Sequence, residues 1–458
     1  MNSIRLLKRL KCNEKLLLQL WSAPKLKRTF LSEAYSCSEA WNKRLESPLL
    51  QKINPLDFYL EMDQKIQNQN KIAAVDADIF ANCVQDDSQS DELADILHKL
   101  RMTRESSFTL ESTHHAVIRY YLSIGQTDVL LNILDDRLNY GIFCNYFDYN
   151  LLMDYFIKQK DFASAAKVAS FMMLQEEFDH PISNALAVYS CHKYLENPDT
   201  WQGVDPEVER LKSEPKEEVK IRVRYIRNPY FDDHFDLWKP SDLVGKTLFW
   251  VGSFGLDGPL GRTCQLRGAV LYRKYTEAIQ ILKKWKEECT KEVVYKEVLP
   301  LIKKDVPELF ESTEPTEEMK ELQKLVLDLE SADLYQENLE QDMENLIKKA
   351  VKAHSEKDMA EQVKLYEEWL EKRVQVLKIH LAELDKISRL AKIEDMKKDL
   401  ADRERVLTFF EKEEQIELAI EEKLAKEKEL YGDESEEVTD DEENYIPPEI
   451  VTKQGEKR

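Results

Sequence analysis

The chain has 458 residues, 34% of them charged, with only 11 glycines and a formal net charge of −22. This length allows a sizeable core in two or three structural regions, and scarce glycine with abundant charge favours a mostly helical protein. No apolar run reaches the roughly 20 residues that a membrane-spanning helix needs. The seven cysteines include no Cys-x-x-Cys pair, which argues against a disulfide framework or a zinc ribbon.

The first 30 residues differ in composition from the rest of the chain. They hold eight basic residues against one acid, with leucines supplying an apolar face. This composition predicts a mitochondrial transit peptide over residues 1–30, cut after Phe30, and therefore a location in the mitochondrial matrix. The alternative is a basic helix that stays on the mature protein. Without this segment, which carries +7, the remaining chain has a net charge of −29.

Two consecutive stretches, 111–145 and 146–180, share one plan. Each opens with an amphipathic helix, has a short polar break, and continues in a second helix of small or aliphatic residues. On a shift of 35 residues, Tyr120 corresponds to Tyr155. A period in the mid-thirties with two helices per unit predicts an α-solenoid, in which neighbouring hairpins bury each other's apolar faces.

The second repeat resembles the pentatricopeptide family in its details. A Tyr-Asn pair, Tyr149 and Asn150, lies in its first helix, and alanines mark its second helix at 163–166. Arrays of this family read single-stranded RNA at about one base per repeat. The resemblance implies contact with a base by Asn150 together with the last residue of the repeat. That residue is His180, or Asp179 if the register differs by one.

In the preceding repeat the corresponding residues are His115 and Asn145. A histidine departs from the Asn, Thr or Ser usual in the family, which argues against base-specific reading at that position. The other interpretation of all these residues is that they only pack or solvate the groove. The RNA-binding residues that the resemblance implies in the repeats are Tyr149, Asn150, His180, His115 and Asn145.

The surroundings of the repeat narrow the resemblance. Residues 138–143 followed by 149–158 are similar to the pentatricopeptide protein family of the mitochondrial small ribosomal subunit, number twenty-seven of that series, as are 31–35 with Trp41, and 366–369. This resemblance implies a structural protein that binds small-subunit rRNA and neighbouring ribosomal proteins and supports mitochondrial translation. Two alternatives are a pentatricopeptide RNA-processing or stability factor, and a helical-repeat protein scaffold without RNA binding, which the acidic charge favours.

Composition divides the rest of the chain into further regions. Residues 31–195 are expected to form an N-terminal cap and the repeats, 196–261 an irregular insertion punctuated by prolines, and 262–310 a further helical hairpin. Basic residues gather in the last two regions: Lys220, Arg222, Arg224 and Arg227 with Tyr225, and then Arg262, Arg267, Arg273 and Lys274. These clusters could hold RNA phosphates and stack bases, or pair with neighbouring acids.

The C-terminal third is rich in Glu, Lys and Leu. After Pro315 neither proline nor glycine occurs until Gly432, so residues 316–431 are expected to form long charged helices. A slip in the apolar pattern argues against one unbroken coiled coil, and a break near 353–358 would allow an antiparallel coiled coil. Residues 432–458 are expected to be a disordered acidic tail. The predicted fold is therefore all-α, with a pentatricopeptide-like α-solenoid followed by long C-terminal helices.

The sequence carries no convincing enzyme motif. Residues 244–247, Val-Gly-Lys-Thr, resemble the end of a phosphate-binding loop, but Pro240 stands where that loop requires a glycine. His114 and His115 are neighbours on a predicted helix and point about 100° apart, which makes them a poor metal-binding pair. We therefore expect no enzymatic activity, no cofactor, no metal ion and no small-molecule substrate.

Overall fold

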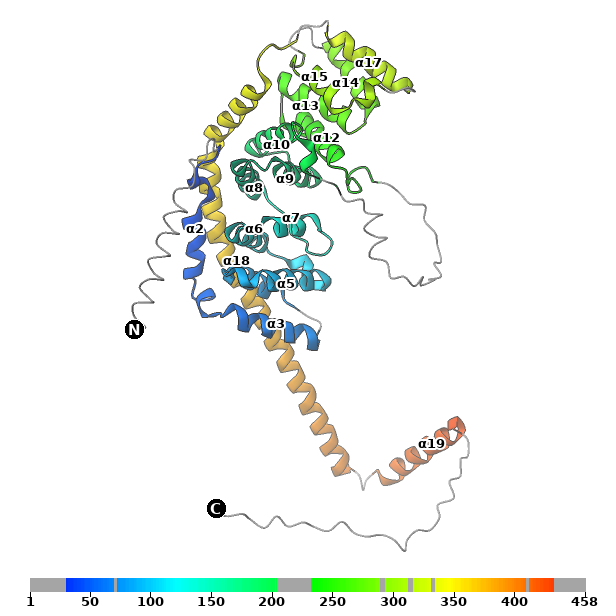
Figure 1. Ribbon diagram of the computed structural model, residues 1–458. Helices are drawn as coiled ribbons and strands as arrows, with labels where there is room; N and C mark the ends of the chain where they lie inside the picture. The colour runs from blue at the N-terminus through cyan, green and yellow to red at the C-terminus, as the bar shows by residue number, and fades with distance from the viewer. Residues whose placement is uncertain are drawn as a thin grey trace, which may run out of the picture. The chain divides into compact units, whose positions relative to one another are not determined.

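The computed structural model describes residues 30–69, 72–201, 203, 232–288, 293–311, 316–330, 334–408 and 412–431. Within these ranges the regular secondary structure is helical, which confirms the predicted all-α fold (Figure 1). The chain divides into two compact units, Met1–Val376 and Leu377–Arg458. The predicted acidic tail and all but Phe30 of the predicted transit peptide lie outside the described residues. None of the helices that are described is both long and apolar enough to cross a membrane.

The first unit is built on a stack of helical hairpins. The stack begins, in chain order, with α4 (Ala74–Cys83), α5 (Ser90–Met102), α6 (Glu111–Ile124), α7 (Thr127–Asp135), α8 (Tyr146–Gln159), α9 (Phe162–Leu174) and α10 (Pro181–Tyr194). Helices α6, α8 and α10 begin 35 residues apart, and so do α7 and α9. This period confirms the solenoid that the sequence predicts.

Polar residues cap the helices of the α8–α9 hairpin and define its turn. Asn145 caps α8 by accepting the backbone N–H of Asp148 at 2.8 Å. Lys160 ends this helix in the left-handed region at φ 63°, and Asp161 then accepts the N–H of Ser164 at the start of α9. The alanines of α9 are buried, which allows the two helices to pack closely.

An insertion separates α10 from the helix that completes its hairpin. Helix α12 (Pro240–Trp250) packs against both α9 and α10, the place of a second helix in the array. A π-helical turn, Val251–Gly255, and α13 (Gly258–Leu271) follow. The prediction of an irregular insertion over 196–261 is therefore wrong from Pro240 onwards. Its proline begins a helix, where a missing N–H costs nothing, rather than breaking one.

Glycines allow α12 and α13 to cross at close range. A side chain at Gly245 would come within 2.8 Å of the backbone nitrogen of Tyr272, and one at Gly252 within 2.6 Å of the carbonyl oxygen of Gly261. Lys246 is buried between these helices and its Nζ donates to the Asp233 carbonyl at 2.6 Å. The Val-Gly-Lys-Thr sequence therefore belongs to a buried helix contact and not to a phosphate-binding loop.

A second apolar core lies beyond α13. It includes side chains from α13, α14 (Tyr275–Glu288), α15 (Val298–Asp305), α16 (Glu308–Glu311) and α17 (Glu317–Glu330). Helix α14 packs against both α13 and α17. The hairpin predicted over 262–310 is thus present as α13 and α14, extended by shorter helices.

The long C-terminal helix α18 spans Leu339–Thr408, 70 residues without interruption. The predicted break near 353–358, and with it an antiparallel pairing across that point, is wrong because no proline or glycine interrupts the helix there. In the first unit its buried side chains recur at helical spacing: Met343, Ile347, Ala350, Asp358, Gln362, Tyr366, Trp369 and Arg373. Helix α19 (Glu413–Tyr431) belongs to the second unit.

The chain that precedes the array runs through short helical turns. These are η1 (Glu33–Ser36), α2 (Ser38–Asn42), η2 (Lys43–Glu46) and η3 (Leu50–Lys52), followed by α3 (Pro55–Gln69). Leu31, Tyr35 and Trp41 from this N-terminal segment are buried in the same core as the repeats and the first half of α18. The array, the N-terminal segment and α18 therefore share one apolar core.

Candidate nucleic-acid interface

Asp78, His115 and Asn150 occupy corresponding positions in α4, α6 and α8. His115 and Asn150 are 35 residues apart, the period of the array, and Asp78 lies 37 residues before His115. We call the surface formed by these three positions the reading face, because the pentatricopeptide resemblance implies base contact at two of them, His115 and Asn150. All three side chains are completely buried.

Helix α18 lies along the reading face and supplies a contact to each of its positions. The contacts come in reverse chain order, from Arg373 to Asp78, from Tyr366 to His115, and from Asp358 to Asn150 through Tyr35. The three α18 residues are seven and eight positions apart, which is about 10–12 Å along a helix. Packed helices lie about 8–10 Å apart, so the spacing on α18 approximates the spacing of the repeats.

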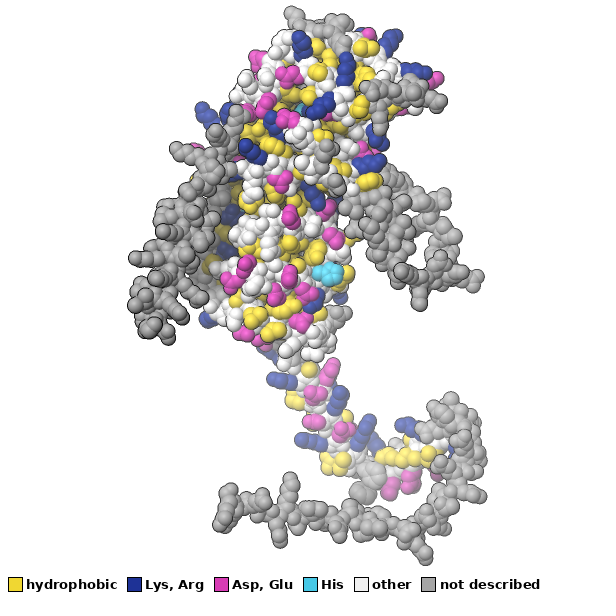
Figure 2. Space-filling model, in the orientation of Figure 1, with side chains coloured by type: hydrophobic (Ala, Val, Ile, Leu, Met, Phe, Trp, Pro, Cys, Tyr) yellow, Lys and Arg dark blue, Asp and Glu magenta, His cyan; other side chains and the backbone are white. Residues whose placement is uncertain are grey.

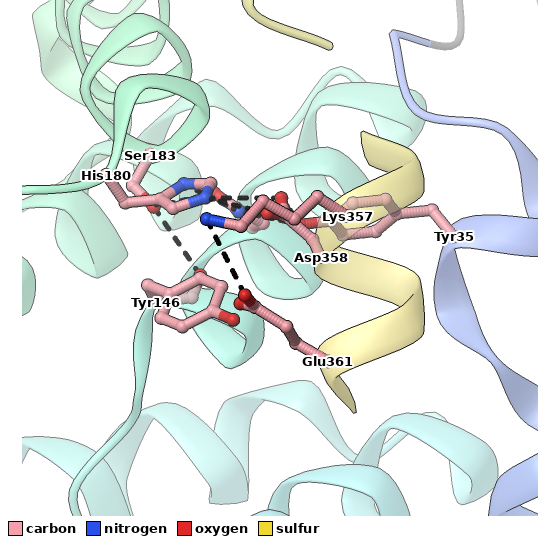
Figure 3. Close-up of polar contacts among 8 residues, drawn as sticks. Tyr35, Tyr146, His180, Ser183, Lys357, Asp358 and Glu361 are labelled. Atoms are coloured by element: carbon pink, nitrogen blue, oxygen red, sulfur yellow. Dashed lines mark hydrogen bonds and ion pairs between the residues drawn. The ribbon is translucent and has the colours of Figure 1, made fainter. Parts of the chain in front are cut away.

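Asn150 is held in a network of buried polar groups. Its amide nitrogen donates to the Tyr35 hydroxyl at 2.9 Å, and its carbonyl accepts the Ser183 hydroxyl at 2.8 Å. Tyr35 donates to Asp358 at 3.0 Å, and the Nε2 of His180 lies 3.2 Å from the same carboxylate (Figure 3). Burial and the Asp358 charge raise the pKa of Tyr35, which keeps its hydroxyl protonated. Asn150 and His180 are thus brought together around a carboxylate of α18.

His115 is bonded at both ring nitrogens. Its Nδ1 lies 2.6 Å from the Asp148 carboxylate and its Nε2 lies 3.0 Å from the Tyr366 hydroxyl. The ring packs edge-on against Trp41, 4.8 Å between centroids, and beside Trp369 at 5.4 Å. Burial lowers the pKa of His115 although Asp148 opposes this shift, so the neutral ring donates to Asp148 and accepts from Tyr366.

Asp78 forms a buried ion pair with α18. Its carboxylate accepts the Nε of Arg373 and the hydroxyls of Ser112 and Thr113, the last at 2.9 Å. A buried carboxylate is tolerated only where an opposite charge and further donors replace the lost water. Here the amide nitrogen of Asn82, which donates at 3.2 Å, is a fourth donor, and the ion pair therefore fixes α18 to α4.

The remaining repeat residues that the resemblance implies have structural roles. Tyr149 lies in the core, where its hydroxyl donates to Gln175. Asn145 caps α8, as described above. Asp179, the alternative to His180, is exposed. Base contact by Asn150, His115 or Tyr149 is therefore not supported in this conformation, because α18 and the N-terminal segment cover these side chains.

The predicted hairpin over 262–310, which carries the second basic cluster, contains one arginine that is buried and that RNA cannot reach. Arg267 is 2% exposed, its Nε donates to Asp305 at 2.6 Å, and its Nη1 lies 2.5 Å from the Nδ1 of His192. Burial, with the charge of Arg267, lowers the pKa of His192 well below its usual range. The neutral His192 ring can therefore accept from Arg267, whose charge is matched by Asp305 inside the protein.

The other basic residues of the hairpin differ in their surroundings. Lys274 pairs with Asp233 at 2.8 Å, the Nε of Arg262 donates to the Val293 carbonyl at 2.6 Å, and Arg273 is exposed. On the face seen in Figure 2, basic and acidic side chains are interspersed and form no single basic patch. The predicted cluster of Lys220, Arg222, Arg224, Tyr225 and Arg227 lies outside the described residues.

Sequence reasoning assigned no binding role to the residues that occupy the reading face. Tyr35, Asp358 and Arg373 come from segments distant from the repeats in the chain. One signal pointed to them, since stretches 31–35 and 366–369 share the resemblance that the central repeat shows. Aromatic residues in an otherwise Glu-, Lys- and Leu-rich helix were the visible sign that part of α18 is buried.

The site therefore combines a helical repeat array with a reading face that the chain itself occupies. Within the described part of the chain, no three His, Cys, Asp or Glu side chains are arranged to bind a metal ion. A family model described as mitochondrial 28S ribosomal protein S27 matches residues 4–429, which is most of the chain and includes the repeats and α18. The chain belongs to the mitochondrial 28S ribosomal protein S27 family.

Proposed function

We propose that this protein is a structural component of the mitochondrial small ribosomal subunit. In this proposal it lies in the mitochondrial matrix, binds small-subunit rRNA and neighbouring ribosomal proteins, and supports mitochondrial translation without catalytic activity. The family match over residues 4–429 carries the proposal. The basic, leucine-containing first 30 residues support import into mitochondria.

The occupied reading face supports a fixed structural role. For Asn150 to contact a base, it would have to lose its bonds to Tyr35 and Ser183. Leaving buried polar partners unpaired costs about 1–3 kcal/mol for each group, so RNA would compete poorly with α18. A factor that selects transcripts by base sequence needs an open array, which disfavours the RNA-processing alternative.

We infer that rRNA is held by surfaces outside the reading face. Candidates are the exposed Arg273, Arg262 near the start of α13, and the cluster at 220–227. Contact by Asn150 with His180, or by His115 with Asn145, would require α18 to leave the array.

A protein scaffold without RNA binding is the second candidate. The net charge of −22 and the covered reading face favour it. In that case the exposed part of α18 and the outer faces of the hairpins would bind proteins only.

Sedimentation of the tagged full-length protein from detergent-lysed mitochondria tests the proposal. We expect the protein to migrate with the small subunit in magnesium and to remain with it after a high-salt wash. Migration as free protein or in a small RNase-sensitive complex would contradict the ribosomal function and favour an RNA-processing factor. A large complex that survives RNase and contains no rRNA would favour the scaffold.

A further inference from the structure

A cavity of about 450 Å³ opens between the N-terminal segment and helices α6 and α8. This volume is within the range of about 300–1,000 Å³ in which proteins bind small molecules. The residues that define its chemistry are Trp41, Asn42, Arg44, Gln85, Arg119 and Tyr155. None of them belongs to the reading face, so this cavity stays accessible while α18 is in place.

Two guanidinium groups line this cavity and have no carboxylate partner among the described residues. Arg44 lies over the Trp41 ring at 3.9 Å and donates from Nη1 to the Trp41 carbonyl, while its buried Nε has no hydrogen-bond partner within the described chain. Arg119 lies 5.9 Å from the same ring and forms no hydrogen bond or ion pair with the described residues. Among the described residues that line the cavity there is no Asp or Glu.

This arrangement favours occupation by an anion. The chain holds 88 acidic residues against 66 basic ones, so an arginine pair without an acid is not explained by composition. Burial, together with the charges of Arg119 and Arg373, lowers the pKa of Arg44 to about 10. The like charges therefore repel each other in a partly desolvated place, which is how anion sites are commonly built.

The lining favours a nucleotide over a carboxylate side chain. Arginine guanidinium groups bind phosphate oxygens in pairs of parallel hydrogen bonds. Trp41 and Tyr155 offer aromatic surface, and Asn42 and Gln85 offer the donors and acceptors that base and ribose edges require. A lone carboxylate would use the two arginines and leave the rest of the cavity unfilled.

We propose that this cavity binds one phosphate of an RNA strand together with its unpaired nucleotide. Arg44 and Arg119 hold the phosphate, and the aromatic and amide side chains hold the base and ribose. The proposal rests on the proposed function, since it assumes that the protein meets RNA. It places an RNA contact outside the reading face that the pentatricopeptide resemblance implies.

Fluorescence anisotropy tests the proposal with full-length protein and a fluorescein-labelled single-stranded RNA of about 12 nucleotides. We expect Arg119→Gln to raise the Kd about tenfold, because one charge-assisted phosphate contact is lost. The slope of log Kd against log salt should fall by about 1. Arg104→Gln is the matched control, since Arg104 is exposed on η5 (Arg104–Phe108) and the charge change is the same.

A stability measurement separates binding from folding. Arg119 makes no hydrogen bond or ion pair in the described protein, and its removal relieves repulsion of Arg44, so Arg119→Gln should not lower the Tm. Arg44→Gln is the less clean variant because Arg44 packs on Trp41. A weaker-binding Arg119→Gln variant with an unchanged or higher Tm supports the proposal.

Three results would overturn it. Arg119→Gln could bind the RNA as well as the wild-type protein does, or the wild-type protein could fail to bind it. A synthetic peptide of the acidic residues 433–443 could bind the wild-type protein, lose affinity with Arg119→Gln and displace the RNA, which would assign the cavity to an acidic segment. None of these results changes whether the protein sediments with the small subunit, so failure of the proposed function is detected separately.

Discussion

The two halves of α18 have similar composition and opposite surroundings. Up to Arg373, aliphatic, aromatic and charged side chains of the helix are buried against the repeats and the N-terminal segment. From Leu377 to Thr408, the large aliphatic side chains are exposed, among them Ile379, Leu384, Ile387, Leu390, Ile393 and Leu400. Apolar residues on a helix are therefore not sufficient to decide whether it packs.

Polar side chains in register with the repeats distinguish the buried half. Asp358, Tyr366 and Arg373 each meet one position of the reading face, at a spacing that matches the stacked helices. The exposed half has aliphatic residues but makes no comparable set of contacts among the described residues. Variants that change one half of the helix at a time can test this difference.

Removal of Arg373 should have the largest effect. Arg373→Ala leaves the buried Asp78 carboxylate without its counter-charge, and we expect a loss of about 3–5 kcal/mol in the free energy of unfolding. Chemical denaturation of the full-length protein measures this loss. Arg405→Ala, in the exposed half of the same helix, is the control and should change stability by less than about 0.5 kcal/mol. Equal losses for both variants would mean that the ion pair does not hold α18.

Tyr35→Phe should have an intermediate effect. It removes the hydroxyl that links Asn150 to Asp358, so two buried polar groups lose a partner. We expect a loss of about 1–3 kcal/mol in unfolding free energy. Tyr140→Phe provides the comparison, since no hydrogen bond of the Tyr140 hydroxyl occurs within the described chain. A stability unchanged by Tyr35→Phe would contradict the network around Asp358.

The free energy of unfolding should fall as the pH drops below the usual pKa of histidine. Burial lowers the pKa of His115 and of His192 in the folded state, so protonation favours unfolding. Their contribution to stability is complete above about pH 6.5, the pKa of histidine in the unfolded chain, and is lost as the pH falls below that value.

Thermal unfolding between pH 7.5 and about pH 5.5 would measure this dependence. His115→Gln should reduce the slope of Tm against pH relative to that of the wild-type protein. Asp154 and Glu177, whose pKa values burial raises, oppose the trend at lower pH, which is why the range stops there. A steeper slope in His115→Gln would refute the buried neutral ring.

The smallest effect is expected in the exposed half of α18. Ile387 is 62% exposed, so Ile387→Glu should change the free energy of unfolding by less than about 0.5 kcal/mol. Ile347→Glu is the matched change at a buried position of the same helix and should destabilise the protein strongly. A large loss of unfolding free energy for Ile387→Glu would show that the exposed aliphatic residues of α18 are packed in solution.

The sequence predicted the elements whose signals are local. The period of 35 and the polar breaks within it predicted the hairpins of α6 to α9, and the absence of proline and glycine from 316–431 predicted long helices there. The break predicted at 353–358 was wrong because no proline or glycine interrupts the backbone hydrogen bonds of α18 there. Helix α12 was missed because its proline and glycine, Pro240 and Gly245, resemble those of loops.

Occupation of the reading face could not be predicted in the same way. A buried polar side chain such as Asn150 has the same one-letter pattern whether it faces a base or another side chain of the protein. Asn150 is linked to Asp358 through Tyr35. Asp358 is 208 positions further along the chain than Asn150, and no local period connects the two. Only the assembled structure brings the N-terminal segment, the repeats and α18 together.

The contacts across the reading face also determine the order in which the protein can fold. Tyr35 and Asp358 are separated by 323 residues in the chain, and Asp78 and Arg373 by 295. Each hairpin needs only its neighbours and can form early, whereas contacts between distant segments form slowly. A chain entering a compartment from its N-terminus would therefore stack its repeats while α18 is still absent. The reading face would stay open to other molecules until the last third of the chain arrives.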